Sequence, residues 1–124
     1  MEITIENLMP ACGRLRAEFA CTLGRAIGIW HGERLPVPFR AQVEIDIDDH
    51  AAIAPAGVPA RYAIGCSGNV SRVTGQVDST GDGMLCVRVG NDVLQLDVPQ
   101  AARFRRGDWI RIETTELHVY PFSL

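Results

Sequence analysis

Short runs of strand-forming residues, separated by clusters of turn residues, fill the second half of the chain from Arg61 to Phe122. Met84 to Val89 and Val93 to Val98 are rich in valine and leucine, and Gly90-Asn91-Asp92 lies between them. Glycine and asparagine adopt the turn conformations that join neighbouring antiparallel strands. The pattern therefore predicts a series of hairpins in this half.

The clearest strand of the first half runs from Phe39 to Asp48, where apolar and polar residues alternate without a break. Val43, Ile45 and Ile47 fall on one side of an extended chain, and the acidic residues between them fall on the other. Such alternation indicates one buried face and one face in water, as in antiparallel sheets.

The segment from Arg14 to Ile27 fits two structures, since its apolar residues match both a strand and a helical stripe. Gly13, Gly24 and Gly28 weaken the helix, because each glycine costs about 1 kcal/mol relative to alanine in a helix interior. We therefore favour a hairpin that turns at Gly24 and returns through 26–31.

The remaining segments show weaker patterns of apolar, polar and turn-forming residues. Met1 to Glu6 alternates and predicts a short strand, and Asn7 to Gly13 predicts a connection because it contains Pro10. Residues 49–60, which contain two prolines and a glycine, predict a long surface loop with room for one helical turn over 50–54.

These elements predict an all-β fold: a small antiparallel barrel or sandwich, partly open and OB-like, with seven to nine short strands and at most one short helix, in 12–27 or 49–60. Residues 1–124 are expected to form a single domain, with the loop 49–60 between two strand-rich halves. The turn and strand of Gly107 to Glu113 resemble those before a closing strand in OB-type barrels, a likeness of architecture alone.

The predicted core consists of apolar residues on the inward faces of these strands. They are Ile3, Ile5, Leu15, Phe19, Phe39, Val43, Ile45, Ile47, Val77, Leu85, Val87, Leu94, Leu96, Ile110, Ile112 and Val119.

Composition narrows the classes of function. The net charge of −3 disfavours non-specific nucleic-acid binding, which depends on neutralising phosphates. No apolar run is long enough to span a membrane, and Met1 to Glu6 does not begin a secretory signal, so we expect a cytoplasmic protein without a membrane partner. Cys12, Cys21, Cys66 and Cys86 contain no C-x-x-C pair, and we expect buried, reduced thiols.

The first candidate site is the acidic row Glu44, Asp46 and Asp48. On a strand these carboxylates project from one face about 7 Å apart. They could be simply solvated, could face a basic protein surface, or could bind a hard cation such as Mg²⁺ or Ca²⁺. The spacing is too wide for shared coordination unless a loop folds over it.

The second candidate is the group Arg103, Arg105, Arg106 and Trp109. Arginine beside aromatic rings suits single-stranded nucleic acid on a barrel, because the rings stack on bases while arginine binds phosphates. The simpler interpretation is that Phe104 and Trp109 belong to the core and that the arginine side chains are solvated.

The sequence predicts no catalytic residue, no metal ligand set and no cofactor, because it contains no G-x-S-x-G motif, no phosphate-binding loop and no clustered His/Cys spacing.

Our leading hypothesis is a non-enzymatic protein-binding domain, such as a bacterial immunity or antitoxin-like protein or an operon adapter. Its acidic strand face would dock a basic partner. One alternative is a barrel that binds single-stranded nucleic acid. Another is a small metal-binding or enzymatic domain around Asp46, Asp48 and His50. Homodimer formation is left open, because unpaired barrel edges can pair across a two-fold axis.

Overall fold

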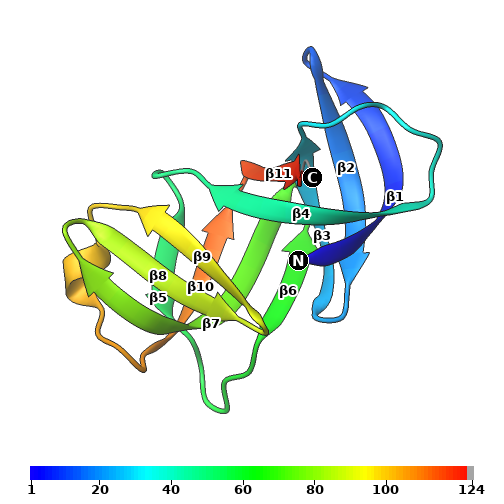
Figure 1. Cartoon of the computed structure of the whole chain (residues 1–124). Coiled ribbons are helices and arrows are strands. Elements are labelled where there is room, and N and C mark those ends of the chain that lie inside the picture. The colour runs from blue at the N-terminus through cyan, green and yellow to red at the C-terminus, as the bar shows by residue number, and fades with distance from the viewer. Residues whose placement is uncertain (123–124) are drawn as a thin grey trace.

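The structure is a computed structural model that describes residues 1–122. These residues form eleven strands and one 3-10 turn, and Figure 1 shows how they are arranged. The elements are β1 (Glu2–Ala11), β2 (Arg14–Cys21), β3 (Gly24–Trp30), β4 (Phe39–Ile47), β5 (Ala52–Pro55), β6 (Ala63–Ser67), β7 (Val70–Gly81), β8 (Met84–Val89), β9 (Asp92–Asp97), η1 (Ala101–Arg103), β10 (Trp109–Thr114) and β11 (Leu117–Pro121). The predicted all-β class is confirmed, whereas the predicted number of strands was too low.

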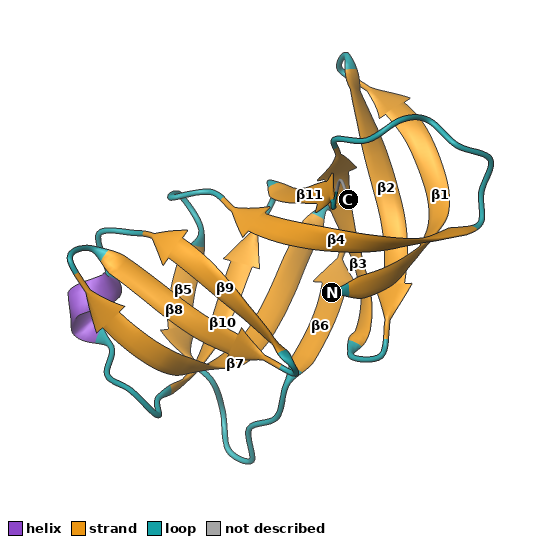
Figure 2. Ribbon diagram, viewed as in Figure 1, coloured by secondary structure: helices purple, strands orange, loops and turns teal. Residues whose placement is uncertain are grey.

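Five strands close a barrel in the order β4-β1-β2-β3-β11 and back to β4. All neighbours in this barrel are antiparallel except β3 and β11, which run parallel. Figure 2 shows that β11, the last strand of the chain, lies among the first four strands. The strand that closes this barrel therefore follows the other six strands in the sequence.

The other six strands are organised around the long strand β7. Its first part lies between β6 and β10, and its last part pairs with β8. The β8–β9 hairpin extends the sheet on one side, and β5 extends it beyond β10 on the other. Within residues 1–122, β9 pairs with β8 alone, so this part of the sheet ends in a free strand edge.

The two parts of the chain share one connection scheme. In the first, β1, β2 and β3 form a meander and β4 returns to pair with β1. In the second, β7, β8 and β9 form a meander and β10 returns to pair with β7. The first scheme is closed by β11, whereas the second is left open beside β9.

The join between the two parts is tight at Gly24, where β3 meets β6. Gly24 has a φ of +138°, and a Cβ atom there would lie 1.9 Å from the carbonyl oxygen of Ile64. The Ile64 amide also donates a hydrogen bond to the carbonyl oxygen of Leu23 at 3.0 Å. A side chain at position 24 would therefore push the two strands apart.

Buried side chains from both parts form one hydrophobic cluster. Every predicted core residue is buried except Leu15 and Phe39, which are half-buried and pack against the cluster. Trp30 and Leu117 also belong to this core, although the sequence pattern did not single them out.

The hairpin interpretation of 14–27 is confirmed, with β2 and β3 joined by a turn just before Gly24. Two segments expected to be irregular are strands. β1 continues to Ala11 through Pro10 by means of a bulge between Ile5 and Asn7, and 52–55 is β5, paired with β10, instead of loop or helix. The sequence pattern did not predict these two strand segments, because pairing with another strand stabilises them and local propensity does not.

The short helical element also lies elsewhere than expected, at η1 after β9. The described part of the chain has no helix of the length and apolar character needed to cross a membrane. The cysteines are free thiols, but the expectation that they are buried was wrong: Cys12 and Cys66 are exposed, and Cys21 and Cys86 are half-buried. Cys12 lies in the β1–β2 turn with a φ of +52°, a place in the fold that composition cannot reveal.

Candidate binding groove

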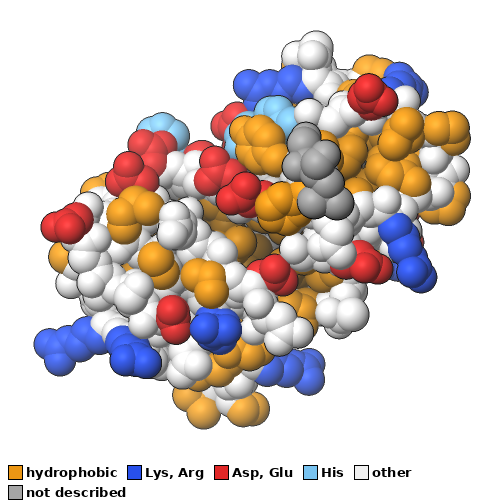
Figure 3. All heavy atoms as spheres, in the orientation of Figure 1, with side chains coloured by type: hydrophobic (Ala, Val, Ile, Leu, Met, Phe, Trp, Pro, Cys, Tyr) orange, Lys and Arg blue, Asp and Glu red, His pale blue; other side chains and the backbone are white. Residues whose placement is uncertain are grey.

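A groove of about 1250 Å³ lies between β4 and the β8–β9 hairpin. Figure 3 shows this hollow near the middle of one face, with acidic side chains gathered along β4 at its rim and most arginine side chains toward the margins of the face. The groove coincides with the open side of the second sheet, where β9 has no further strand neighbour in the described part of the chain. Its position is therefore a direct consequence of the strand order.

Six carboxylates line the groove, and none of its described lining residues is an arginine or a lysine. The acidic residues are Glu44, Asp46, Asp48, Asp49, Asp92 and Asp97. The structure thus brings the three acidic residues predicted from β4 together with two from β9, which the sequence did not connect to them. Such a concentration of one sign of charge attracts a cationic partner.

The side chains of Glu44 and Asp46 are exposed because β4 alternates as predicted, with Val43, Ile45 and Ile47 buried. Neither carboxylate forms a salt bridge or a side-chain hydrogen bond within residues 1–122. Both charges are therefore available to a partner.

Asp48 differs from the other two acidic residues of the row. Its carboxylate accepts a hydrogen bond of 2.7 Å from the Thr114 hydroxyl and one of 3.3 Å from the His50 amide. Asp48 is half-buried, and it ties the end of β4 to the end of β10. Its first role is thus structural, although it still lines the groove.

The amino terminus closes one end of the groove. The Met1 ammonium group donates to the Val43 carbonyl oxygen at 3.0 Å and lies 3.1 Å from a carboxylate oxygen of Asp92. This pair connects β4 to β9 and neutralises Asp92. Glu44, Asp46 and Asp97, by contrast, form neither a salt bridge nor a side-chain hydrogen bond within residues 1–122.

The groove also presents apolar surface. Val93, Tyr120 and Phe122 line it with exposed fractions of 44%, 39% and 54%. Ile47 and Leu94 lie deeper and are buried. An apolar centre with a charged rim is the usual composition of a protein-binding surface.

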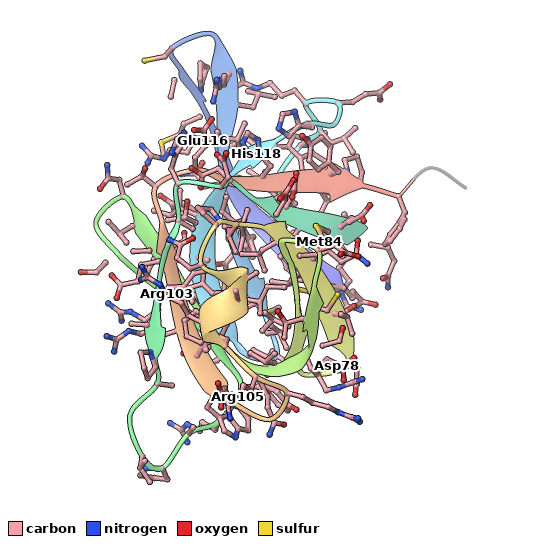
Figure 4. All side chains as sticks on the ribbon, turned by 90° about the vertical axis from the view of Figure 1, so that its left-hand side faces the viewer. Asp78, Met84, Arg103, Arg105, Glu116 and His118 are labelled. Carbon is pink, nitrogen blue, oxygen red and sulfur yellow. The ribbon has the colours of Figure 1, made fainter. Side chains whose placement is uncertain are left out.

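A cluster of aromatic and titratable side chains lies beside the groove and shares Tyr120 with it. His31 stacks on Tyr120 with ring centroids 4.2 Å apart, and its Nε2 lies 2.7 Å from Nδ1 of His118. His118 Nε2 in turn lies 3.4 Å from Glu116, which accepts a 2.8 Å hydrogen bond from Arg14. Figure 4 shows Glu116 and His118 close together at one end of the molecule.

This arrangement shifts two pKa values. Partial burial lowers the pKa of His31, and the charges of His118 and Arg14 lower it further. The hydrogen bond from Arg14 lowers the pKa of Glu116. No sequence signal connects these residues, because the parallel pairing of β3 with β11 brings His31 and His118 together from opposite ends of the chain.

The arginine-rich candidate lies elsewhere. Arg105 and Arg106 are exposed in the loop before β10, Phe104 is buried, and half-buried Trp109 packs on Tyr62 with ring centroids 5.0 Å apart. Figure 4 shows Arg103 and Arg105 separated from each other, with Arg105 at the end opposite Glu116 and His118. None of the four residues lines the groove, and the interpretation of Phe104 as a core residue is confirmed.

The third candidate, around Asp46, Asp48 and His50, shows no assembled ligand set. His50 lies 3.5 Å from Asp49, and Asp48 is engaged with Thr114. Among residues 1–122, no three His, Cys, Asp or Glu side chains are grouped so that they could hold a metal ion.

Three comparisons with known proteins add no assignment: no family model, no curated protein and no solved structure matches this chain. The functional interpretation therefore depends on the geometry of the groove.

Proposed function

We propose that this chain is a non-enzymatic protein-binding domain that docks a basic partner in the groove between β4 and β9. The observation that carries the proposal is the combination of uncompensated carboxylates with exposed apolar side chains in one hollow. Glu44, Asp46 and Asp97 supply the charge, and Tyr120 and Phe122 supply the apolar contact. Charge complementarity accelerates association, while the buried apolar contact supplies most of the affinity.

We also propose that the closed barrel belongs to the OB type. The Greek-key order, in which β1 pairs with both β2 and β4 and the last strand closes the barrel, supports this classification. OB-type barrels carry many unrelated functions, so the classification by itself assigns none. A cytoplasmic setting and an immunity-like, antitoxin-like or adapter role in a bacterium agree with this proposal and await identification of the partner.

The test begins with capture of partners from the native host on the immobilised chain, followed by measurement of the association rate of the purified partner. The double variant E44K/D46K is expected to slow association by about tenfold or more at low salt, and the difference should shrink as salt rises. The fold should persist, because both side chains are exposed and unpaired.

The matched control is E18K/E33K, which makes the same change in net charge at two carboxylates outside the groove. We expect it to retain most of the wild-type association rate. Equal rates for the wild-type chain and E44K/D46K at low salt would show that the acidic face is merely solvated, and the proposal would be abandoned.

One observation favours the alternative function, binding of single-stranded nucleic acid. Tyr62 and Trp109 form a half-exposed aromatic pair close in sequence to Arg61 and Arg105, which form no salt bridge within residues 1–122. Retention of oligo-dT at low salt, abolished in R105A/R106A, would support this function over docking of a basic protein.

A further inference from the structure

The groove is bordered by parts of β4 and β9 whose peptide groups, within residues 1–122, have no strand paired to them. On β4, Val43 is the last residue paired across this edge, since its amide donates to the Met1 carbonyl oxygen at 2.8 Å and its carbonyl accepts from the Met1 amino group. β1 begins there, and peptide groups on one edge of a strand recur at every second residue. The N–H and C=O groups of Ile45 and Ile47 therefore continue the same edge into the groove.

The opposite border is β9. Val89 and Asp92 flank the two-residue turn of the β8–β9 hairpin, which makes them a hydrogen-bonded pair. The amide of Val98 donates to Gly83 beside β8, which agrees with this register. The even-numbered residues thus bond to β8, whereas the peptide groups of Val93, Gln95 and Asp97 face away from it.

Side chains alternate in the same way on both borders. Ile45 and Ile47 on β4 and Leu94 and Leu96 on β9 point inward and are buried. Glu44 and Asp46 on β4, and Gln95 and Asp97 on β9, are exposed on the outer side. A strand added to the free edge of β9 would therefore have apolar neighbours on its inner side and acidic neighbours on its outer side.

We propose that the groove binds an extended segment of a partner protein by strand addition, and that the segment alternates basic and apolar residues. Its backbone bonds to the free edge of β9, its apolar side chains continue the core, and its basic side chains meet Glu44, Asp46 and Asp97. The groove volume of about 1250 Å³ exceeds the roughly 300–1,000 Å³ of ordinary small-molecule pockets, which agrees with an extended chain as the occupant. This inference rests on the proposed function and specifies its mode of recognition.

The first experiment uses the capped hexapeptide Arg-Val-Arg-Val-Arg-Val as the probe and measures its affinity for the full chain by titration calorimetry. A block peptide of the same composition, Arg-Arg-Arg-Val-Val-Val, controls for charge alone. We expect the alternating peptide to bind at least about tenfold more tightly, because only it places both kinds of side chain correctly along an extended strand. Equal affinities for the two peptides would overturn the proposal.

Backbone methylation separates strand addition from simple charge attraction. Because alternate N–H groups of a strand point to opposite edges, methylating one set of amides, either those of the arginine or those of the valine residues, blocks the hydrogen bonds to β9, and methylating the other set leaves them intact. We expect one analogue to lose about tenfold or more in affinity and the other to bind like the parent peptide. If both analogues bind as well as the parent peptide while E44K/D46K still weakens binding, strand addition is wrong and docking of a basic partner stands.

The protein side is tested with Q95P, which removes an N–H on the free edge of β9 without removing a bond to β8. Q95A is its matched control, because it keeps the N–H while shortening the side chain. Loss of peptide binding in Q95P but not in Q95A supports the proposal. Should Q95P fail to fold, the methylated peptides still decide the question.

Sedimentation of the same proteins without peptide tests the other occupant of these edges, a second copy of the chain. We expect the wild-type chain to sediment as a monomer. A wild-type dimer that Q95P converts to a monomer would assign the free edges to self-association and overturn the proposal.

Discussion

Glu44, Asp46 and Asp48 occupy equivalent positions in the sequence pattern, but the surroundings of their side chains differ. Glu44 and Asp46 face the groove without a counter-charge, whereas Asp48 binds the Thr114 hydroxyl and the His50 amide. The difference arises because the chain turns immediately after Ile47 and brings Asp48 against the end of β10. A row of like residues on a strand therefore does not imply a row of like roles.

His31 gives a residue-level prediction about pH. Its pKa is lowered from 6.5, so the unfolded chain binds the proton more readily than the folded chain. Stability from this group is present above pH 6.5 and is lost as pH falls below it. Thermal melts between about pH 7.5 and about pH 5.5 should show the melting temperature of the wild-type chain falling on the acid side.

The variant H31F keeps a ring to stack on Tyr120 but cannot titrate, so its melting temperature should fall less over the same range. H50F makes the same change at a histidine whose side chain is 88% exposed and should retain the wild-type dependence. Identical pH profiles for all three proteins would show that His31 does not contribute to the acid sensitivity.

At the scale of elements, β3 and β7 are connected by a side chain although they are not neighbours in the sheet. The Ser71 hydroxyl on β7 donates to the Ile27 carbonyl oxygen at 2.6 Å and accepts from the Ile27 amide at 3.2 Å. Ser71 is one of the two buried polar residues within 1–122, and its contact with Ile27 is part-buried. The two parts of the chain are thus joined by a specific polar contact as well as by apolar packing.

We predict that S71A lowers the free energy of unfolding by about 1–3 kcal/mol, because it leaves the part-buried N–H and C=O groups of Ile27 without this partner. Urea denaturation measures the loss. S79A, at an exposed position near the other end of β7, should change stability by no more than about 0.5 kcal/mol. A similar cost for both variants would show that the Ser71 contact has no special role.

At the scale of the whole molecule, the order of the strands makes the two parts of the chain depend on each other. The closing strand β11 follows the entire second part, and one hydrophobic cluster extends through both. Most of the contacts therefore join residues distant in sequence, a topology that favours slow, cooperative folding. We propose that residues 1–124 behave as a single domain.

The two tryptophans test this proposal, since Trp30 lies in the closed barrel and Trp109 in β10. In W109F the fluorescence reports on the barrel, and in W30F it reports on the second part. For each variant we predict that the fluorescence midpoint in urea coincides with the midpoint of its own far-ultraviolet circular dichroism. A fluorescence transition that clearly precedes the loss of overall structure in either variant would indicate two independent units.

The sequence alone determined most of the strands and the faces they bury. Alternation in β4, the hairpin of β2 and β3, and nearly the whole core were predictable, because side-chain period and turn chemistry act between near neighbours in the chain. The acidic row of the candidate site was predictable for the same reason.

Only the tertiary structure decided which distant strands meet. The pairing of β11 with β3 placed His31 beside His118, and the strand order of residues 1–122, with no further strand beside β9, left Asp97 in the same groove as Glu44. Pairing between strands also extended β1 and formed β5, in segments where the local residues predicted loops. Many strand orders are compatible with the same alternation of apolar and polar residues. Packing of the shared hydrophobic core selects one of these orders, and it does so through contacts between residues that are distant in the sequence.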